Sequence, residues 1–177
     1  MDLFEAIGNR HSWRGGFLDK PVPRADLKKI VQAGIQAPSG CNAQTTSFVG
    51  VDDAALIAEM ARVVDKQVVC EARAIIVCLV DHRPVYQGKT FGVEDCAAAV
   101  ENMLLAVTAL GYATVWLDGA LRSDGRAKRI AALLGVPDDL EVRVILPLGL
   151  PAGQGTQRER KSFAERAWFN RYGDTTA

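Results

Sequence analysis

Three short clusters of polar and basic side chains carry most of the chemistry that this sequence offers. They lie at residues 10–14 (Arg-His-Ser-Trp-Arg), 38–44 (Pro-Ser-Gly-Cys-Asn-Ala-Gln) and 158–161 (Arg-Glu-Arg-Lys). Guanidinium groups present several donors in a fixed geometry, which suits a phosphate group or an electron-rich ring edge. Serine, asparagine and glutamine offer both donors and acceptors. The clusters are therefore candidates for binding an anionic ligand that also makes hydrogen bonds.

Each cluster also has a plainer interpretation. The first could be a solvated basic turn, the second an ordinary turn between a helix and a strand, and the third a solvated run of charges. Cys41 lies in the second cluster, but neither His11 nor His82 adjoins it in the sequence, so a catalytic thiol would lack an activating base. From residue types alone, binding sites and surface features both stay open.

The composition indicates one globular domain spanning residues 1–177. Of these 177 residues, 49% are hydrophobic and 24% are charged. Lys and Arg together number 21, and so do Asp and Glu. A chain without net charge creates no general field toward nucleic acid or an anionic membrane, so any anion site must be local. We therefore expect neither nucleic acid nor a membrane among its partners.

The four cysteines form no Cys-x-x-Cys pair, and the chain has no paired histidines. This spacing favours neither a zinc site nor a disulfide framework, and it is typical of reduced thiols. The first residues lack the basic and apolar regions of a signal peptide, and no run approaches the roughly 18 apolar residues of a membrane span. We expect a soluble, cytoplasmic protein without a bound metal.

Hydrophobic patterns predict the elements that must position these clusters. Helices are expected at 21–37, 54–60, 93–110 and 127–134, and strands at 48–51, 74–80, 112–117 and 141–148. The strand at 74–80 is β-branched and uninterrupted, which favours a central place in the sheet. The helix at 93–110 is small or apolar at nearly every position, so we expect it to be buried almost all round. This order of elements indicates an α+β or α/β fold.

The end of the chain combines a flexible segment with aromatic residues. Residues 152–157 are rich in glycine and predict a segment without regular structure. The tail at 158–173 then carries Phe163, Trp168, Phe169 and Tyr172, which a disordered tail would not normally contain. We expect this tail to be an arm laid across a neighbouring subunit.

In their order and separations, the motifs resemble those of the nitroreductase family of flavoproteins. Residues 10–14 match the family's opening Arg-Arg/His-Ser-x-Arg/Lys motif, and 37–44 match its Ala-Pro-Ser-x-x-Asn-x-Gln loop. Further matches are Pro21-Val22, the small-residue helix before Gly111, the strand and loop at 114–119, Leu148-Gly149-Leu150-Pro151 and Asn170-Arg171-Tyr172-Gly173. The resemblance implies an α+β fold, three-layered like α/β/α, with a central, mostly antiparallel sheet and a buried central helix. It also implies a homodimer that exchanges C-terminal arms.

The resemblance further implies a site for FMN, with NAD(P)H as reductant. The first and third clusters would hold the phosphate and ribityl chain, the second would come from the partner subunit, and the backbone at 118–119 would face flavin N5. Arg14 would lie at the N1 and C2 edge as an electrostatic modulator. The cofactor-binding residues implied in this way are Arg10, His11, Ser12, Arg14, Pro38, Ser39, Gly40, Asn42, Gln44, Asp118, Gly119, Arg158 and Arg160.

The activity implied by the resemblance is transfer of hydride from NAD(P)H through flavin N5 to a nitroaromatic, quinone or similar small acceptor. Two alternatives stay open: a flavin-binding or redox-sensing module with little turnover, and a relative that uses reduced flavin for dehalogenation or flavin fragmentation. Thr45-Thr46 replace the Pro-Trp that the family commonly has. The spacing between Arg14 and Pro21, which includes Gly15-Gly16, is one residue longer than usual. The short stretch at 82–92 implies a small, open substrate site.

Overall fold

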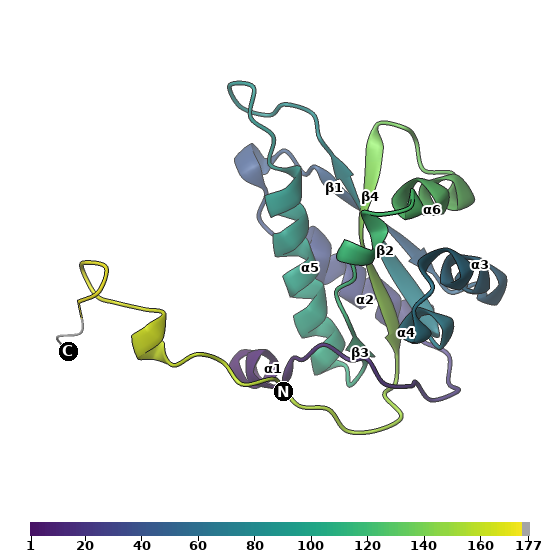
Figure 1. The fold of residues 1–177 in the computed structure, drawn as a ribbon, viewed down its shortest axis with the longest axis horizontal. Coiled ribbons are helices and arrows are strands. Elements are labelled where there is room, and N and C mark those ends of the chain that lie inside the picture. The colour runs from purple at the N-terminus through teal and green to yellow at the C-terminus, as the bar shows by residue number, and fades with distance from the viewer. Residues whose placement is uncertain (175–177) are drawn as a thin grey trace.

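The computed structural model describes residues 1–174, and Figure 1 shows an antiparallel sheet with helices on both faces. The strand order is β1-β2-β4-β3, with bounds β1 Thr46–Val51, β2 Ala74–Asp81, β3 Ala113–Thr114 and β4 Leu140–Gly149. All pairings are antiparallel. The strand β2 lies between two others and is buried from its first residue to Val80. The predicted α+β fold and the central place of this strand are both confirmed.

Helices form a layer on each side of the sheet. Their bounds are α1 Leu3–Asn9, α2 Arg24–Ile35, α3 Ala54–Val64, α4 Gln67–Cys70, α5 Gly92–Ala109 and α6 Arg126–Leu134. Alternate side chains of β2 enter opposite layers, since successive residues of a strand point to opposite faces. Val77 packs in the core with α3, α4 and α6, whereas Ile76 packs in the core with α2 and α5. Figure 1 shows this three-layer arrangement.

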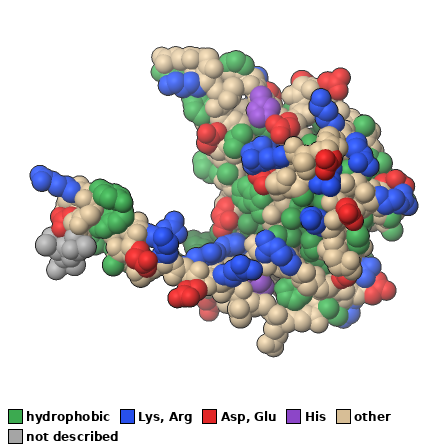
Figure 2. Space-filling model, viewed as in Figure 1, with side chains coloured by type: hydrophobic (Ala, Val, Ile, Leu, Met, Phe, Trp, Pro, Cys, Tyr) green, Lys and Arg blue, Asp and Glu red, His purple; other side chains and the backbone are tan. Residues whose placement is uncertain are grey.

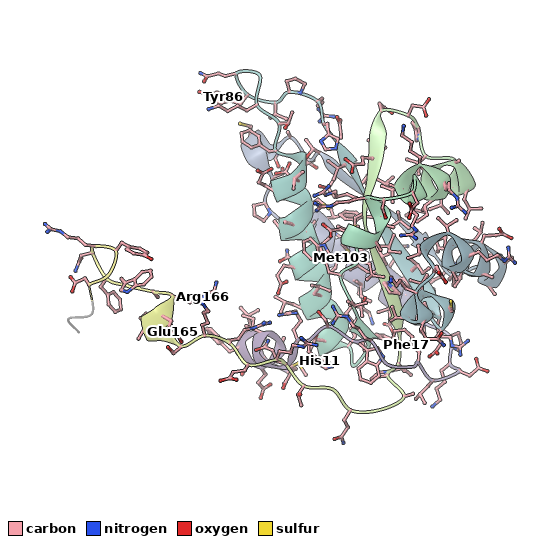
Figure 3. The ribbon with its side chains drawn as sticks, viewed as in Figure 1. His11, Phe17, Tyr86, Met103, Glu165 and Arg166 are labelled. Atoms are coloured by element: carbon pink, nitrogen blue, oxygen red, sulfur yellow. The ribbon has the colours of Figure 1, made fainter. Side chains whose placement is uncertain are left out.

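The close contact between α2 and α5 determines how the second layer is assembled. A Cβ atom at Gly34 would lie 3.0 Å from Met103 Cγ, so the glycine lets the two helices approach closely. Met103 is fully buried and lies on α5 along the sheet (Figure 3). Asn102 adds a hydrogen bond from its Nδ2 to the Ala33 carbonyl oxygen at 3.1 Å. The helix α5 therefore has a fixed position against α2.

Two sequence expectations differ from the structure. The strand expected at 112–117 pairs with β4 only at Ala113–Thr114, and Leu117 makes a separate bridge to Ile145. The chain between them leaves the ladder, which an apolar pattern cannot reveal. The helix α5 is buried along the sheet, but Glu94 and Glu101 are exposed. The expectation of burial almost all round is wrong for a single chain, because one chain covers only part of the helix surface.

The C-terminal tail leaves the body of the protein after Gln157, the last residue that bonds to the N-terminal segment in this part of the chain. Figure 1 shows it extending past α1 and away from the sheet, and Figure 3 places Glu165 and Arg166 well clear of the body. Its aromatic rings pack on one another, with centroids 5.9 Å apart for Phe163 and Phe169 and 4.1 Å apart for Trp168 and Tyr172. Phe163 and Tyr172 are 66% and 89% exposed. Across residues 1–174, no helix is long and apolar enough to cross a membrane.

Candidate functional site

The first and third sequence clusters meet at one cavity of about 340 Å³. Its lining residues are His11, Ser12, Arg14, Thr156, Gln157, Arg158 and Arg160. Gln157 lies 147 positions after Arg10, yet its Nε2 donates a hydrogen bond to the Arg10 carbonyl oxygen at 2.9 Å. A second bond from the same atom reaches the Ile7 carbonyl oxygen at 3.2 Å. Gln157 therefore joins the start of the tail to the N-terminal segment, and we name this hollow the arginine cavity.

The N-terminal wall of the arginine cavity is anchored to the sheet. The Trp13 backbone N–H donates to the Thr114 carbonyl oxygen in β3 at 2.8 Å, and the Trp13 side chain is 7% exposed. The indole N–H donates to the Gly16 carbonyl oxygen at 3.2 Å. Because Trp13 is buried between Ser12 and Arg14, these two neighbours are held at the surface. The alternation of one buried and two exposed residues explains why this cluster can present polar groups.

The imidazole of His11 leaves one polar atom without a partner in the wall of the arginine cavity. Its Nδ1 is 2.9 Å from the Asn9 carbonyl oxygen, which can only accept, so Nδ1 carries the proton. Its Nε2 is buried and has no hydrogen-bond partner in the structure. Buried polar atoms are usually satisfied, because an unpaired one costs free energy. The glycine-rich segment covers this atom, since a Cβ atom at Gly155 would lie 2.3 Å from Nε2.

The arginine cavity is strongly basic. Arg14, Arg158 and Arg160 are exposed, and the described lining contains no Asp or Glu. Figure 2 shows Lys and Arg side chains gathered where the tail joins the body. Three guanidinium groups around one cavity suit a phosphate, which accepts short, charge-assisted and often bidentate hydrogen bonds.

Arg10 lies beside the arginine cavity rather than in its lining. Its Nε is 3.4 Å from Glu101 Oε1 on α5, and the Arg10 side chain is 19% exposed. Sequence reasoning did not identify Glu101, since nothing in the local pattern connects a residue of α5 with the first motif. The structure thus places one of the expected phosphate ligands against a carboxylate.

The second cluster forms a different cavity, of about 310 Å³, between α2, β1 and α5. Pro38, Ser39 and Gln44 contribute to its lining. The Gly40 backbone N–H donates to Asp95 Oδ1 at 2.8 Å, which ties the cluster to the first turn of α5. The arginine cavity instead lies at the other end of α5. In Figure 3, Tyr86 lies in the turn before the N-terminal end of this helix, and His11, which lines the arginine cavity, lies near its C-terminal end. One chain therefore does not bring the first and second clusters together.

The predicted loop at 118–119 begins the short 3-10 helix Gly119–Leu121. The Asp118 carboxylate accepts a hydrogen bond from Arg122 Nη2 at 2.5 Å and lies 3.9 Å from Arg143 Nη2. A Cβ atom at Gly119 would meet nothing within 4 Å, so its backbone borders open space. The side chain of Asp118 is engaged in ion pairs. Only the backbone of this loop is free to meet a ligand.

Comparison with known proteins adds a family to this geometry. Residues 7–76 and 65–150 match the model of the nitroreductase family. A candidate NADH dehydrogenase/NAD(P)H nitroreductase of Archaeoglobus fulgidus is 33% identical over 150 residues, which cover 84% of this chain and 82% of that protein.

Two solved structures have similar folds. A candidate NADH dehydrogenase/NAD(P)H nitroreductase of Bacteroides thetaiotaomicron superposes with a TM-score of 0.84 at 26% identity, covering 96% of this chain and 98% of the other. An FMN-dependent nitroreductase of Clostridium difficile superposes with a TM-score of 0.80 at 23% identity, covering 96% and 99%.

Proposed function

Because this chain belongs to the nitroreductase family, we propose that it is an FMN-dependent oxidoreductase that takes hydride from NAD(P)H and reduces a small acceptor such as a nitroaromatic or a quinone. The observation that carries this proposal is the arginine cavity, in which segments from both ends of the chain meet. Its charge suits a phosphate group. The name of the Clostridium difficile neighbour supports FMN as the group that brings this phosphate.

The residues of the arginine cavity fit the phosphate end of FMN. Arg158 and Arg160 would donate to the phosphate oxygens, together with the Ser12 hydroxyl. His11 would border the ligand through its backbone, because the Gly155 segment covers its buried Nε2. For Arg10 to join them, its guanidinium would leave Glu101, at 3.4 Å. One phosphate-binding cavity favours FMN over FAD, which would need room for an adenine.

FMN supplies the redox chemistry when it is bound, and the chain supplies position and charge. We assign to Arg14 a fixed positive charge at the edge of the flavin where negative charge collects on reduction. The backbone at Gly119, which borders open space, would provide a donor near flavin N5. No side chain is assigned a proton-transfer role. In that position Arg14 would raise the reduction potential of the cofactor.

We propose that the working unit is a homodimer with exchanged tails. The arginine cavity and the loop at 38–44 lie at opposite ends of α5, so a second chain running the other way would bring the partner's loop to the cavity. Apolar side chains are exposed on α1 and on the tail, with Phe4 82% and Phe163 66% exposed. Exposed apolar groups of this kind are typical of an interface. A second copy would cover them.

A cytoplasmic location is part of the proposal. All four cysteines are free thiols, and Cys78 and Cys96 are buried in the core. Free thiols are typical of a reducing compartment.

A second candidate function, a redox-sensing module with little turnover, is favoured by one observation: the segment before α5 is only a short turn closed between Tyr86 and Lys89. Such a turn offers little cover for a substrate.

The identity of the released cofactor tests the proposal. The protein should purify with non-covalent flavin, and heating should release FMN that co-migrates with an FMN standard. Release of FAD, or no flavin after reconstitution with FMN, would contradict the assignment. Rapid anaerobic reduction by NADH or NADPH separates an enzyme from a sensing module, for which slow reduction by both is expected.

A further inference from the structure

A buried carboxylate supports the loop that carries the second cluster. Asp95 lies in the first turn of α5 and is 5% exposed. Its Oδ1 accepts a hydrogen bond from the Gly40 backbone N–H at 2.8 Å, and its Oδ2 accepts one from Thr45 Oγ1 at 2.5 Å. Burying a carboxylate is unfavourable unless hydrogen bonds compensate for the lost water. Both oxygens of Asp95 make such bonds, and both bonds go to the same loop.

The two bonds bracket a stretch of backbone in an uncommon conformation. Between Gly40 and Thr45, the residues Cys41, Asn42 and Gln44 have φ angles of 52°, 55° and 51°. Non-glycine residues disfavour this left-handed region, because the Cβ atom approaches the backbone. Such conformations persist where the surroundings hold them, and they gather at ligand-binding loops. Asp95 holds the loop at both of its ends.

The packing around Gly40 allows the carboxylate to reach the loop. A Cβ atom at Gly40 would lie 2.5 Å from the Phe91 ring, so only glycine permits this approach. A further bond to the loop, from Arg83 Nη2 to the Ala43 carbonyl oxygen at 2.8 Å, is on the exposed side. The Arg83 side chain is 56% exposed, whereas Asp95 is buried. The loop also has a bond of its own, from the Gln44 backbone N–H to Ser39 Oγ at 3.1 Å, and this bond is exposed as well. Hydrogen bonds shielded from water are the stronger ones, so Asp95 is the main support that the loop receives from another element.

We propose that Asp95 is a positioning residue, which holds residues 40–45 in the conformation that presents Ser39, Asn42 and Gln44 to the flavin. This inference rests on the proposed function. A second consequence concerns the chain without FMN: if the carboxylate is removed, the loop loses its left-handed conformation while the sheet keeps its fold. The role is indirect, since Asp95 acts through Gly40 and Thr45 rather than on the cofactor.

The experiment uses full-length protein with Asp95→Ala and two further substitutions. Asp95→Asn is the conservative variant, because its Oδ1 can accept from Gly40 while its Nδ2 donates to Thr45 Oγ1. Glu94→Ala is the matched control. Glu94 lies in the same first turn and is exposed, so its loss removes the same favourable charge at the helix N-terminus without touching Asp95.

The first readout is amide hydrogen exchange, which does not depend on FMN. In Asp95→Ala, the amides of residues 40–44 should exchange about tenfold faster or more, while those of β2 keep their protection. Asp95→Asn should recover most of the protection, and Glu94→Ala should leave it unchanged. Unchanged exchange in Asp95→Ala, or equal loosening in Glu94→Ala, would overturn the inference. If Asp95→Ala does not fold, Asp95→Asn and Thr45→Val decide, with faster loop exchange expected in Thr45→Val.

The second readout is the affinity of the apoprotein for FMN, measured by quenching of flavin fluorescence. Asp95→Ala should weaken the Kd about tenfold, since the loop must then be ordered on binding. Glu94→Ala should bind like the parent protein. A loosened loop with unchanged affinity would overturn the link to the flavin. If the parent protein itself binds no FMN, the proposed function fails, and the exchange data still decide whether Asp95 positions the loop.

Discussion

Replacing Gly155 with alanine should damage the arginine cavity without touching any of its charged groups. Gly155 lies in the glycine-rich segment that covers His11. A Cβ atom there would lie 2.3 Å from His11 Nε2 and 3.1 Å from Trp13 Cε3. Both neighbours are anchored, His11 by its bond to the Asn9 carbonyl oxygen and Trp13 by burial. The exposed segment must therefore move, and Arg158 moves with it.

The size of the effect follows from the contact. The Cβ atom and His11 Nε2 must separate by about 1.1 Å, from 2.3 Å to the 3.4 Å at which ordinary contact begins. An added methyl group that forces such a shift typically costs about 1–3 kcal/mol. If that cost falls on the geometry of the cavity, the Kd for FMN rises roughly fivefold to 150-fold. Since the segment is exposed, we expect only a small change in the melting temperature.

The assay is fluorescence titration of FMN into the apoprotein, beside thermal unfolding. Gly153→Ala is the matched control, because its Cβ atom would lie 3.7 Å from Trp13, an ordinary contact. Neither glycine has a left-handed φ, so both substitutions restrict the unfolded chain alike. Equal FMN affinities for the two variants would refute the reasoning and return the segment to the status of a passive linker.

Three further predictions concern the tail. Replacing both Arg158 and Arg160 with alanine should weaken FMN binding in the same titration; each lost charged hydrogen bond is worth about 1.5–3 kcal/mol, and exposure favours the lower end. Truncation before Ser162 should cost both dimer and flavin, and sedimentation of a truncated dimer that still binds FMN would contradict this. The Ser162 hydroxyl and N–H hold the pKa of Glu165 below its ordinary value, so the turn they form should persist at neutral pH and be lost as pH falls through that lowered pKa. Amide exchange of residues 162–166 against pH measures this, and Glu165→Gln should abolish the pH dependence.

Sequence patterns predicted most of the elements because burial on a sheet imposes a clear period. The strand expected at 74–80 matches β2 to within one residue, and the helix expected at 127–134 matches α6, which ends at Leu134 before Gly135. The helix α1 was not predicted. It has only seven residues, and it depends on the capping box between Asp2 and Glu5 rather than on an apolar stripe. Short helices of this kind leave little periodic signal.

The candidate site was predictable where the motifs themselves form it. The first and third clusters do line one cavity, but the long-range contacts that complete it carry no local signal. Glu101 and Asp95 both lie in α5, a helix whose composition indicates core packing. Their partners, Arg10 and Gly40, are more than fifty positions away. Only the packing of the folded chain shows which of the polar residues in an apolar helix meet the loops.

The decisive measurement is anaerobic titration of the purified protein with NADH and with NADPH. We predict a yellow protein whose flavin absorbance is bleached by at least one of the two nucleotides and returns when a nitroaromatic or a quinone is added. A flavin that is present but resists both nucleotides would contradict the proposed enzyme and favour a sensing module. A colourless protein that cannot be reconstituted with FMN would contradict the account of the arginine cavity itself.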